Sequence, residues 1–383
     1  MKQVFYILKR ELNLVSTNKA LVLVLLIAPI LYAFMYGSIY LYKTEEKVAL
    51  AVVDMDGSEL SRTIATQVDA TMMADVVYAS DMQSAREMMN DGTVQGYLFF
   101  EKGLEQQVLS LQKSTITLVV NGARFLPASD LTATVTKIAL TLSTGVRLKY
   151  ISSKGSGNEA ALKQANPIVL DYRPLFNESS SYGAFLLPGL LAIILQQTLF
   201  IGLVAGMGIE NETRFKGLSG HNSASSILFG KTAFYVILFL ITGLFFVLIN
   251  FSVLSIPMRG SGLHLLLLTT IFLSTLVPMG LLIGSFFKTS LLGMQVMAFS
   301  SYPMFLITGY SMPLQSLPKM VQFISALLPT TPFLKAYQSI TQAGGNLYDN
   351  RYSLIHLLLL CIVYGLLFLV RISHLKKTRM IAL

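Results

Sequence analysis

The stretch Leu21–Tyr42 reads LVLVLLIAPILYAFMYGSIYLY and contains no charged residue. A helix needs about 20 consecutive apolar residues to cross the hydrocarbon core of a bilayer, so this stretch predicts a transmembrane helix over residues 20–43. It is too long for the apolar region of a cleavable signal peptide. Tyr40, Tyr42 and Lys43 stand where a small-residue cleavage site is expected, so we expect the helix to be retained.

The rest of the chain contains further runs of this kind. Its residues are 53% hydrophobic and only 13% charged, whereas soluble domains average about 25% charged residues. The fold class predicted is a polytopic α-helical membrane protein with six transmembrane helices and an inserted α/β extracytoplasmic domain. The five later spans, which lie within residues 184–371, are Ala184–Met207, Ile227–Ser255, Leu265–Phe286, Leu291–Ser311 and Leu354–Arg371.

Residues 44–183 have the composition of a soluble domain and form the predicted inserted domain. Short β-branched runs alternate in it with helical patterns and turn residues, which favours an α/β arrangement. Asp54 and Asp56 follow the first run, and we interpret them as turn residues rather than metal ligands. The predicted strands are Val48–Val53, Val76–Tyr78, Gln95–Phe100 and Thr115–Val120, and the predicted helices are Ser58–Asp69, Ser80–Asn90 and Ala128–Ser153.

Basic residues set the predicted orientation. With six spans and a cytoplasmic N-terminus, Lys and Arg are concentrated in residues 1–19, 208–226 and 372–383, the last being a basic cytoplasmic tail. Both termini are then cytoplasmic, in a multi-pass protein of the cytoplasmic membrane. The net charge of +9 falls on the inner surface and indicates contact with anionic membrane lipids, not with nucleic acid.

Residues 1–19 repeat apolar side chains at helical spacing. This pattern predicts an amphipathic interfacial helix on the inner leaflet, with Phe5, Leu8 and Leu12 in the lipid and Lys9 and Arg10 at the headgroups. The alternative is a frayed N-terminus that merely carries positive charge.

Residues 312–352 are too irregular for a simple outer loop. Two apolar stretches, Met320–Leu328 and Phe333–Ile340, are each too short to span a bilayer. We therefore predict an outer re-entrant hairpin of proline-broken helices. Its prolines are Pro313, Pro318, Pro329 and Pro332.

A search for chemistry finds no catalytic set. Gly230-Lys231-Thr232 lacks the earlier glycine of a phosphate-binding loop and enters an apolar run, so Lys231 is interpreted as a positive anchor that snorkels to the headgroups. The four His have no partner at metal-ligand spacing. We expect no cofactor or metal bound by this chain. Because Cys361 is the one cysteine, no intrachain disulfide is possible.

The apolar runs contain no Asp or Glu. Carriers driven by protons or ions need ionisable groups near mid-membrane, so the pattern favours a translocator driven from outside the chain. Polar residues within the runs are open to two interpretations: helix–helix hydrogen bonds or contacts with a transported molecule. They are Gln196, Gln197, Asn250 and Gln295.

This organisation resembles the ABC-2-type permeases, the transmembrane subunits of bacterial ABC exporters, in the branch with a large extracytoplasmic domain between the first two helices. The resemblance covers nearly the whole chain. Three stretches carry it: Glu210–Gly217 with Ile227–Lys231; Ile307–Leu314 with Leu317 and Pro318; and Leu327–Pro332 with Ala336 and Tyr337.

The resemblance implies the partners. A cytoplasmic ABC ATPase subunit would bind ATP and Mg²⁺ and receive the coupling loop within 208–226. A second permease copy or a sister permease would complete the transporter, and a periplasmic adaptor and an outer-membrane channel are further expected partners. The coupling residues implied are Glu210, Glu212, Arg214, Lys216 and Gly217.

The expected function is therefore that of a permease subunit of an ATP-driven exporter for hydrophobic or amphiphilic substrates. Candidate pathway residues are Tyr302, Phe305 and Tyr310, which could equally pack inside the protein. One alternative is a non-transporting membrane scaffold or receptor whose outer domain binds a partner. Another is a membrane enzyme acting on lipid, for which no catalytic set is visible.

Overall fold

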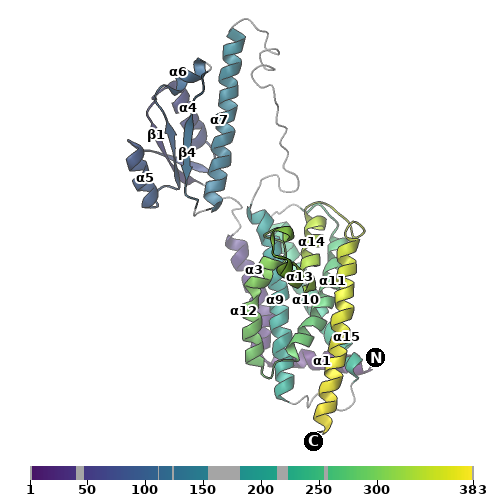
Figure 1. Cartoon of the computed structure of the whole chain (residues 1–383). Coiled ribbons are helices and arrows are strands. Elements are labelled where there is room, and N and C mark those ends of the chain that lie inside the picture. The colour runs from purple at the N-terminus through teal and green to yellow at the C-terminus, as the bar shows by residue number, and fades with distance from the viewer. Residues whose placement is uncertain are drawn as a thin grey trace. The chain divides into compact units, whose positions relative to one another are not determined.

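The computed structural model describes residues 2–39, 47–110, 112–122, 125–153, 182–213, 223–253 and 258–381. The chain forms two compact units (Figure 1). One is helical and combines Met1–Lys43 with Pro174–Leu383, and the other is an α/β unit over Thr44–Arg173. Both segments of the helical unit are apolar, and the segment between them is not.

Six helices of the helical unit are long and apolar enough to cross a membrane, among the residues described. This agrees with the six predicted spans. The first is built from α2 (Lys19–Val22), a π-helical turn η1 (Leu23–Ile27) and α3 (Ala28–Ile39). The others are α9 (Tyr182–Glu212), α10 (Ala224–Leu248) with the π-helical η2 (Ile249–Val253), α11 (Gly262–Gly284), α12 (Ser290–Ile307) and α15 (Arg351–Ile381).

The N-terminal helix α1 (Lys2–Thr17) is separate from the first span. Asn18 divides them, because its side-chain oxygen accepts hydrogen bonds from the backbone N–H groups of Ala20 and Leu21 and so caps α2. α1 and the C-terminal end of α15 lie at the same end of the helical unit (Figure 1).

Two helices run further than the sequence predicted. Helix α9 continues to Glu212, so the predicted loop 208–226 begins inside a helix, and α15 continues to Ile381 through most of the predicted tail 372–383. The apolar run Ala184–Met207 contains no acidic residue, as stated from the sequence, but the candidate span continues beyond it through Glu210 to Glu212. Hydropathy misses such ends because a helix can extend beyond its apolar stretch.

Helix α9 is the centre of the unit. It packs against the first span, α10, α11, α12 and α14. Glycines permit several of these contacts: a Cβ on Gly280 of α11 would come 2.6 Å from Leu203, and one on Gly284 would come 2.8 Å from Met207. Small residues at such crossings let helix backbones approach closely, which is typical of membrane bundles.

The segment after α12 forms the 3₁₀ turn η3 (Leu314–Ser316), α13 (Lys319–Leu327) and α14 (Thr330–Thr341). Pro313, Pro318 and Pro329 each stand at an N-cap, and Pro332 lies in the first turn of α14. Helix α15 holds the end of α13, because His356 and Tyr364 hydrogen-bond to the carbonyl groups of Ala326 and Leu327. Two short proline-started helices are thus present as predicted; their re-entry into a membrane remains a prediction.

The α/β unit contains a four-stranded sheet of order β2-β1-β3-β4, with β1 parallel to β2 and β3, and β4 antiparallel to β3. The strands alternate with helices, as the sequence predicted, and α6 is an addition. The strands are β1 (Val48–Asp54), β2 (Ala74–Tyr78), β3 (Gly96–Phe100) and β4 (Ile116–Val120), and the helices are α4 (Glu59–Asp69), α5 (Met82–Asn90), α6 (Leu104–Leu109) and α7 (Phe125–Ser153).

The two aspartates after β1 have structural roles. Asp54 accepts hydrogen bonds from the backbone N–H groups of Asp56 and Gly57, which closes the turn. Asp56 reaches across to α6 and accepts from the backbone N–H groups of Gly103, Leu104 and Glu105. These contacts support the turn interpretation, and Asp56 also caps a helix far along the chain.

Candidate functional site: a buried ion cluster joining α1, α9 and α10

Helix α1 crosses α10 at very close range. A Cβ added to Gly230 of α10 would lie 2.7 Å from Cβ of Ile7 and 3.2 Å from the carbonyl oxygen of Val4. Only glycine leaves room for this approach, because real Cβ atoms do not come so near to another carbon. The glycine of Gly230-Lys231-Thr232 therefore serves helix packing.

The crossing encloses a set of ion pairs that we call the ion cluster: Arg10 and Glu11 of α1, Glu210 of α9, and Lys231 of α10. The Nζ atom of Lys231 lies 2.8 Å from an oxygen of Glu11 and 2.8 Å from an oxygen of Glu210. The Nη1 atom of Arg10 lies 3.0 Å from Glu11 and 2.7 Å from Glu210. Tyr235, one turn along α10, donates its hydroxyl to the second oxygen of Glu11.

The ion cluster is electrically balanced and almost wholly buried. Two cations face two anions, and the side chains of Glu11, Glu210 and Lys231 are at most 1% exposed. Burial opposes the charge on Arg10, but the carboxylates of Glu210 and Glu11 outweigh it and raise the pKa of Arg10. Removing one member of a buried pair leaves an uncompensated charge and costs about 3–5 kcal/mol, so each charge of the ion cluster depends on the presence of its partners.

The C-terminal end of α9 makes further contacts that fix its position. Asn211 donates to the carbonyl group of Phe287 at 2.7 Å, and Glu212 accepts from the backbone N–H of Ser290 at 2.8 Å. Gly208 faces the start of α12, where a Cβ would come 2.5 Å from Cα of Ser290. The last turn of α9 is thus joined to α1, α10 and the α11–α12 turn at once.

The predicted coupling residues fall in different places. Glu210 is buried in the ion cluster, and Glu212 is exposed at the end of α9. Arg214, Lys216 and Gly217 lie outside the described residues. A role of these residues in coupling stays a prediction, and for Glu210 the burial means that it would act through α1 and α10.

The position of Lys231 corrects its interpretation as a positive anchor at the headgroups. It does not snorkel toward headgroups; it is 1% exposed and pairs with two carboxylates. The sequence held a signal that was missed: Glu11 stands between Ile7 and Val15 at intervals of one turn, on the face of α1 that is buried. An acid within a buried apolar stripe needs a cation opposite, and Lys231 is the cation there.

The predicted interfacial residues divide between two faces of α1. Phe5, Lys9 and Leu12 are exposed, Leu8 is half-buried, and Arg10 belongs to the ion cluster. Besides the face predicted to contact lipid, α1 therefore has a face that packs against α10, which the amphipathic pattern did not predict. Contact of Phe5 and Leu12 with lipid remains a prediction.

The three candidate pathway residues also divide. Tyr302 of α12 is 70% exposed, whereas Phe305 and Tyr310 are buried within the unit. Tyr310 stacks on Phe185 and donates its hydroxyl to the carbonyl of the same residue. It also fills the space over Gly189 of α9. Phe305 and Tyr310 thus pack the bundle, and Tyr302 alone of the three is on an exposed face.

The buried glutamines of α9 connect helices. The amide nitrogen of Gln197 donates to the carbonyl of Met297 at 2.7 Å and to the hydroxyl of Ser301 at 2.8 Å, both on α12. Gln196 accepts a hydrogen bond from the hydroxyl of Thr330 at the start of α14. These contacts favour the helix–helix interpretation for both residues.

Six candidate spans, with a separate N-terminal helix joined to them through a buried polar junction, indicate a multi-pass helical membrane protein. Comparison with known proteins gives the family: residues 19–370 match the family described as ABC-2 family transporter protein, and the chain belongs to that family. This confirms the resemblance to the ABC-2 family, while the branch with a large extracytoplasmic domain stays a prediction.

Two relatives carry a more particular description. The chain is 26% identical over 180 residues to the probable multidrug ABC transporter permease YbhS of Escherichia coli strain K12, and the same values hold for the protein of that name from Escherichia coli O157:H7. The matched residues are 46% of this chain and 48% of each relative. The chain thus spans about half the length of the curated relatives that it matches.

Proposed function

We propose that this chain is the permease subunit of an ATP-driven exporter in the bacterial cytoplasmic membrane, with both termini cytoplasmic. It moves a hydrophobic or amphiphilic substrate out of the cytoplasm or the inner leaflet. A separate ATPase subunit binds ATP and Mg²⁺ and supplies the energy. The family match supports the class of transporter, and the description of the relatives as probable multidrug permeases supports the kind of substrate.

The ion cluster is the observation that carries this proposal. Residues 213–223 connect α9 to α10, and Glu210 and Lys231 lie just before and just after that connection. A force applied to the connection by an ATPase would reach α9 and α10 together. Because α1 is paired to both helices through Arg10 and Glu11, it would move with them.

Further partners belong to the same proposal. A second copy of the permease or a sister permease would complete the translocator, and the exposed face of α12 around Tyr302 would contribute to the pathway between the two. The α/β unit would be extracytoplasmic and would meet a periplasmic adaptor and an outer-membrane channel. Anionic lipids would neutralise the basic inner surface.

The test reconstitutes the chain in vesicles with the ATPase that co-purifies with it and follows ATP-driven movement of a fluorescent amphiphilic dye. The double variant Glu212→Gln with Arg214→Gln should hydrolyse ATP without moving dye, and glutamine at 212 keeps an acceptor for the Ser290 N–H. The matched control is Glu59→Gln with Arg62→Gln, an exposed acid–base pair of α4.

Two results would contradict the proposal. Uphill dye movement by the isolated chain would show that it powers itself. If no ATPase co-purifies and no dye moves, the result would favour the scaffold or receptor hypothesis, in which the α/β unit binds a partner.

A further inference from the structure

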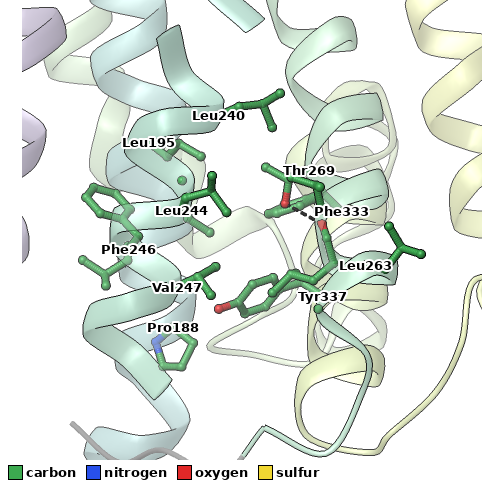
Figure 2. A pocket seen from close by; sticks show the side chains of 16 residues that line it. Pro188, Leu195, Leu240, Leu244, Phe246, Val247, Leu263, Thr269, Phe333 and Tyr337 are labelled. Atoms are coloured by element: carbon green, nitrogen blue, oxygen red, sulfur yellow. Dashed lines mark hydrogen bonds between the residues drawn. The ribbon is translucent and has the colours of Figure 1, made fainter. Parts of the chain in front are cut away.

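The helical unit contains a cavity of about 450 Å³ between α9, α10, α11 and α14. It lies near the start of α9 and α11 and the end of α10, and therefore toward one end of the spans (Figure 2). Its size is within the range of about 300–1,000 Å³ typical of small-molecule pockets. None of the residues of the ion cluster lines it. Lining residues include Pro188, Leu195, Gly243, Phe246, Leu263 and Phe333.

The wall is chemically uniform. Among the described lining residues none is charged, and the side-chain hydroxyls belong to Thr269 and Tyr337. Thr269 already donates to the carbonyl of Leu265 at 2.8 Å. Such a wall cannot solvate an ion or a polar headgroup, but it gains dispersion contacts from any hydrocarbon that fills it.

The cavity opens to the surface of the helical unit between α10 and α11. Its exposed lining side chains are Leu244 of α10 and Leu263 and Leu266 of α11, all within candidate membrane spans. The deeper wall is buried, with Leu191 of α9, Phe246 and Phe333 at most 4% exposed. In a bilayer, the leucines at this opening are in contact with acyl chains, so hydrocarbon is the material next to the cavity.

We infer that this cavity is a binding site for one acyl chain of a membrane phospholipid, which enters between α10 and α11. The site is within one chain and apart from the exposed face of α12 that carries Tyr302. It does not depend on the transported substrate or on the ATPase. A bound chain would fill the space between α14 and the bundle, where Phe333 stacks on Phe272 of α11.

The test uses the absence of tryptophan from this chain. Single tryptophans are introduced into the full-length protein, which is reconstituted in vesicles of phospholipid with brominated acyl chains that quench indole fluorescence on contact. Phe246→Trp reports on the cavity wall, because the side chain of Phe246 lines the cavity and is only 4% exposed. Leu248→Trp reports on bulk lipid, because the side chain of Leu248 is 54% exposed. Phe239→Trp, on the same helix, fully buried and not among the residues that line the cavity, is the weakly quenched reference.

We expect Phe246→Trp to be quenched nearly as strongly as Leu248→Trp, and Phe239→Trp to be quenched weakly. A second substitution, Gly243→Leu, should remove the quenching of the tryptophan at 246 and leave that at 248 unchanged. Position 243 accepts a side chain, since a Cβ would lie 3.6 Å from Thr269 and 3.9 Å from Leu195. Gly365→Leu is the matched control on α15, where the nearest atom is 3.8 Å away.

If the tryptophan at 246 is quenched no more strongly than the tryptophan at 239, the inference is overturned. The cavity would then hold something other than an acyl chain, such as a protein segment or a transported molecule. Equal quenching with and without Gly243→Leu would overturn it as well, because the bromine would then reach the indole by another route. Tyr337→Trp on α14 is the second reporter if Phe246→Trp does not fold.

Discussion

The ammonium group of Lys231 on α10 lies 2.8 Å from a carboxylate oxygen of Glu11 on α1, and neither side chain is more than 1% exposed. The two residues are far apart in the sequence, and each would be costly to bury alone. Their pairing attaches α1 to the helical bundle.

Lys231→Met should destabilise the protein by about 3–5 kcal/mol, because Glu11 and Glu210 would then share Arg10 alone. The double variant Lys231→Met with Glu11→Gln should recover most of this loss, since one cation and one anion are removed together. Thermal unfolding in detergent measures both effects. Lys9→Met, an exposed lysine of α1, is the control, and an equal effect of Lys9→Met and Lys231→Met would refute the structural importance of the ion cluster.

Gly230→Ala should push α1 away from α10, because the new methyl group would come 2.7 Å from Cβ of Ile7. Overpacking of this kind costs about 1–3 kcal/mol. In Gly365→Ala the methyl group meets its nearest neighbour at 3.8 Å, so this variant should unfold at the temperature of the unmodified protein. A normal unfolding temperature for Gly230→Ala would mean that α1 is held less closely than the structure shows.

Asp56→Asn should loosen α6 in the α/β unit. Burial disfavours the charge of Asp56, but hydrogen bonds from the Ser58 hydroxyl and from the N–H groups of residues 103–105 outweigh it and lower the pKa of Asp56 below 3.8. A lowered pKa stabilises the fold at neutral pH, and the stabilisation is lost as the pH falls through that pKa.

Hydrogen–deuterium exchange at neutral pH measures this effect. Amides of α6 should exchange faster in Asp56→Asn, while Asp75→Asn, at an exposed residue of β2, should leave them unchanged. The difference in unfolding temperature between Asp56→Asn and the unmodified protein should shrink on acidification. A difference that grows instead would contradict the role assigned to the carboxylate.

Gln197→Met keeps the volume of a buried α9 side chain but removes its hydrogen bonds to Met297, Ser300 and Ser301 of α12. Hydrogen bonds between membrane helices contribute about 0.6 kcal/mol on average, so we expect a small fall in unfolding temperature and no change in which dyes are transported. A changed substrate range with unchanged stability would instead support a pathway role for Gln197.

The spans and the α/β unit could be anticipated because each depends on a local pattern. Long uncharged runs have few structural alternatives to a transmembrane helix. Strands such as β1 and β3 alternate with turn residues along the chain. The errors came at helix ends. Helix α5 begins at Met82 rather than at the predicted Ser80, with Asp81 as its N-cap. Helix α9 continues through Glu210 because that charge is neutralised by residues the local sequence does not show.

Hydropathy was enough to predict six candidate spans, since the cost of exposing backbone to lipid leaves helices as the solution. The alternation of β-branched runs with turn residues was enough to predict the α/β segment between the first two spans. Which charges meet inside it depended on tertiary packing. Glu11, Glu210 and Lys231 come from three helices, and only the close crossing at Gly230 brings them within 3 Å. Low dielectric surroundings then make each of these charges depend on the others.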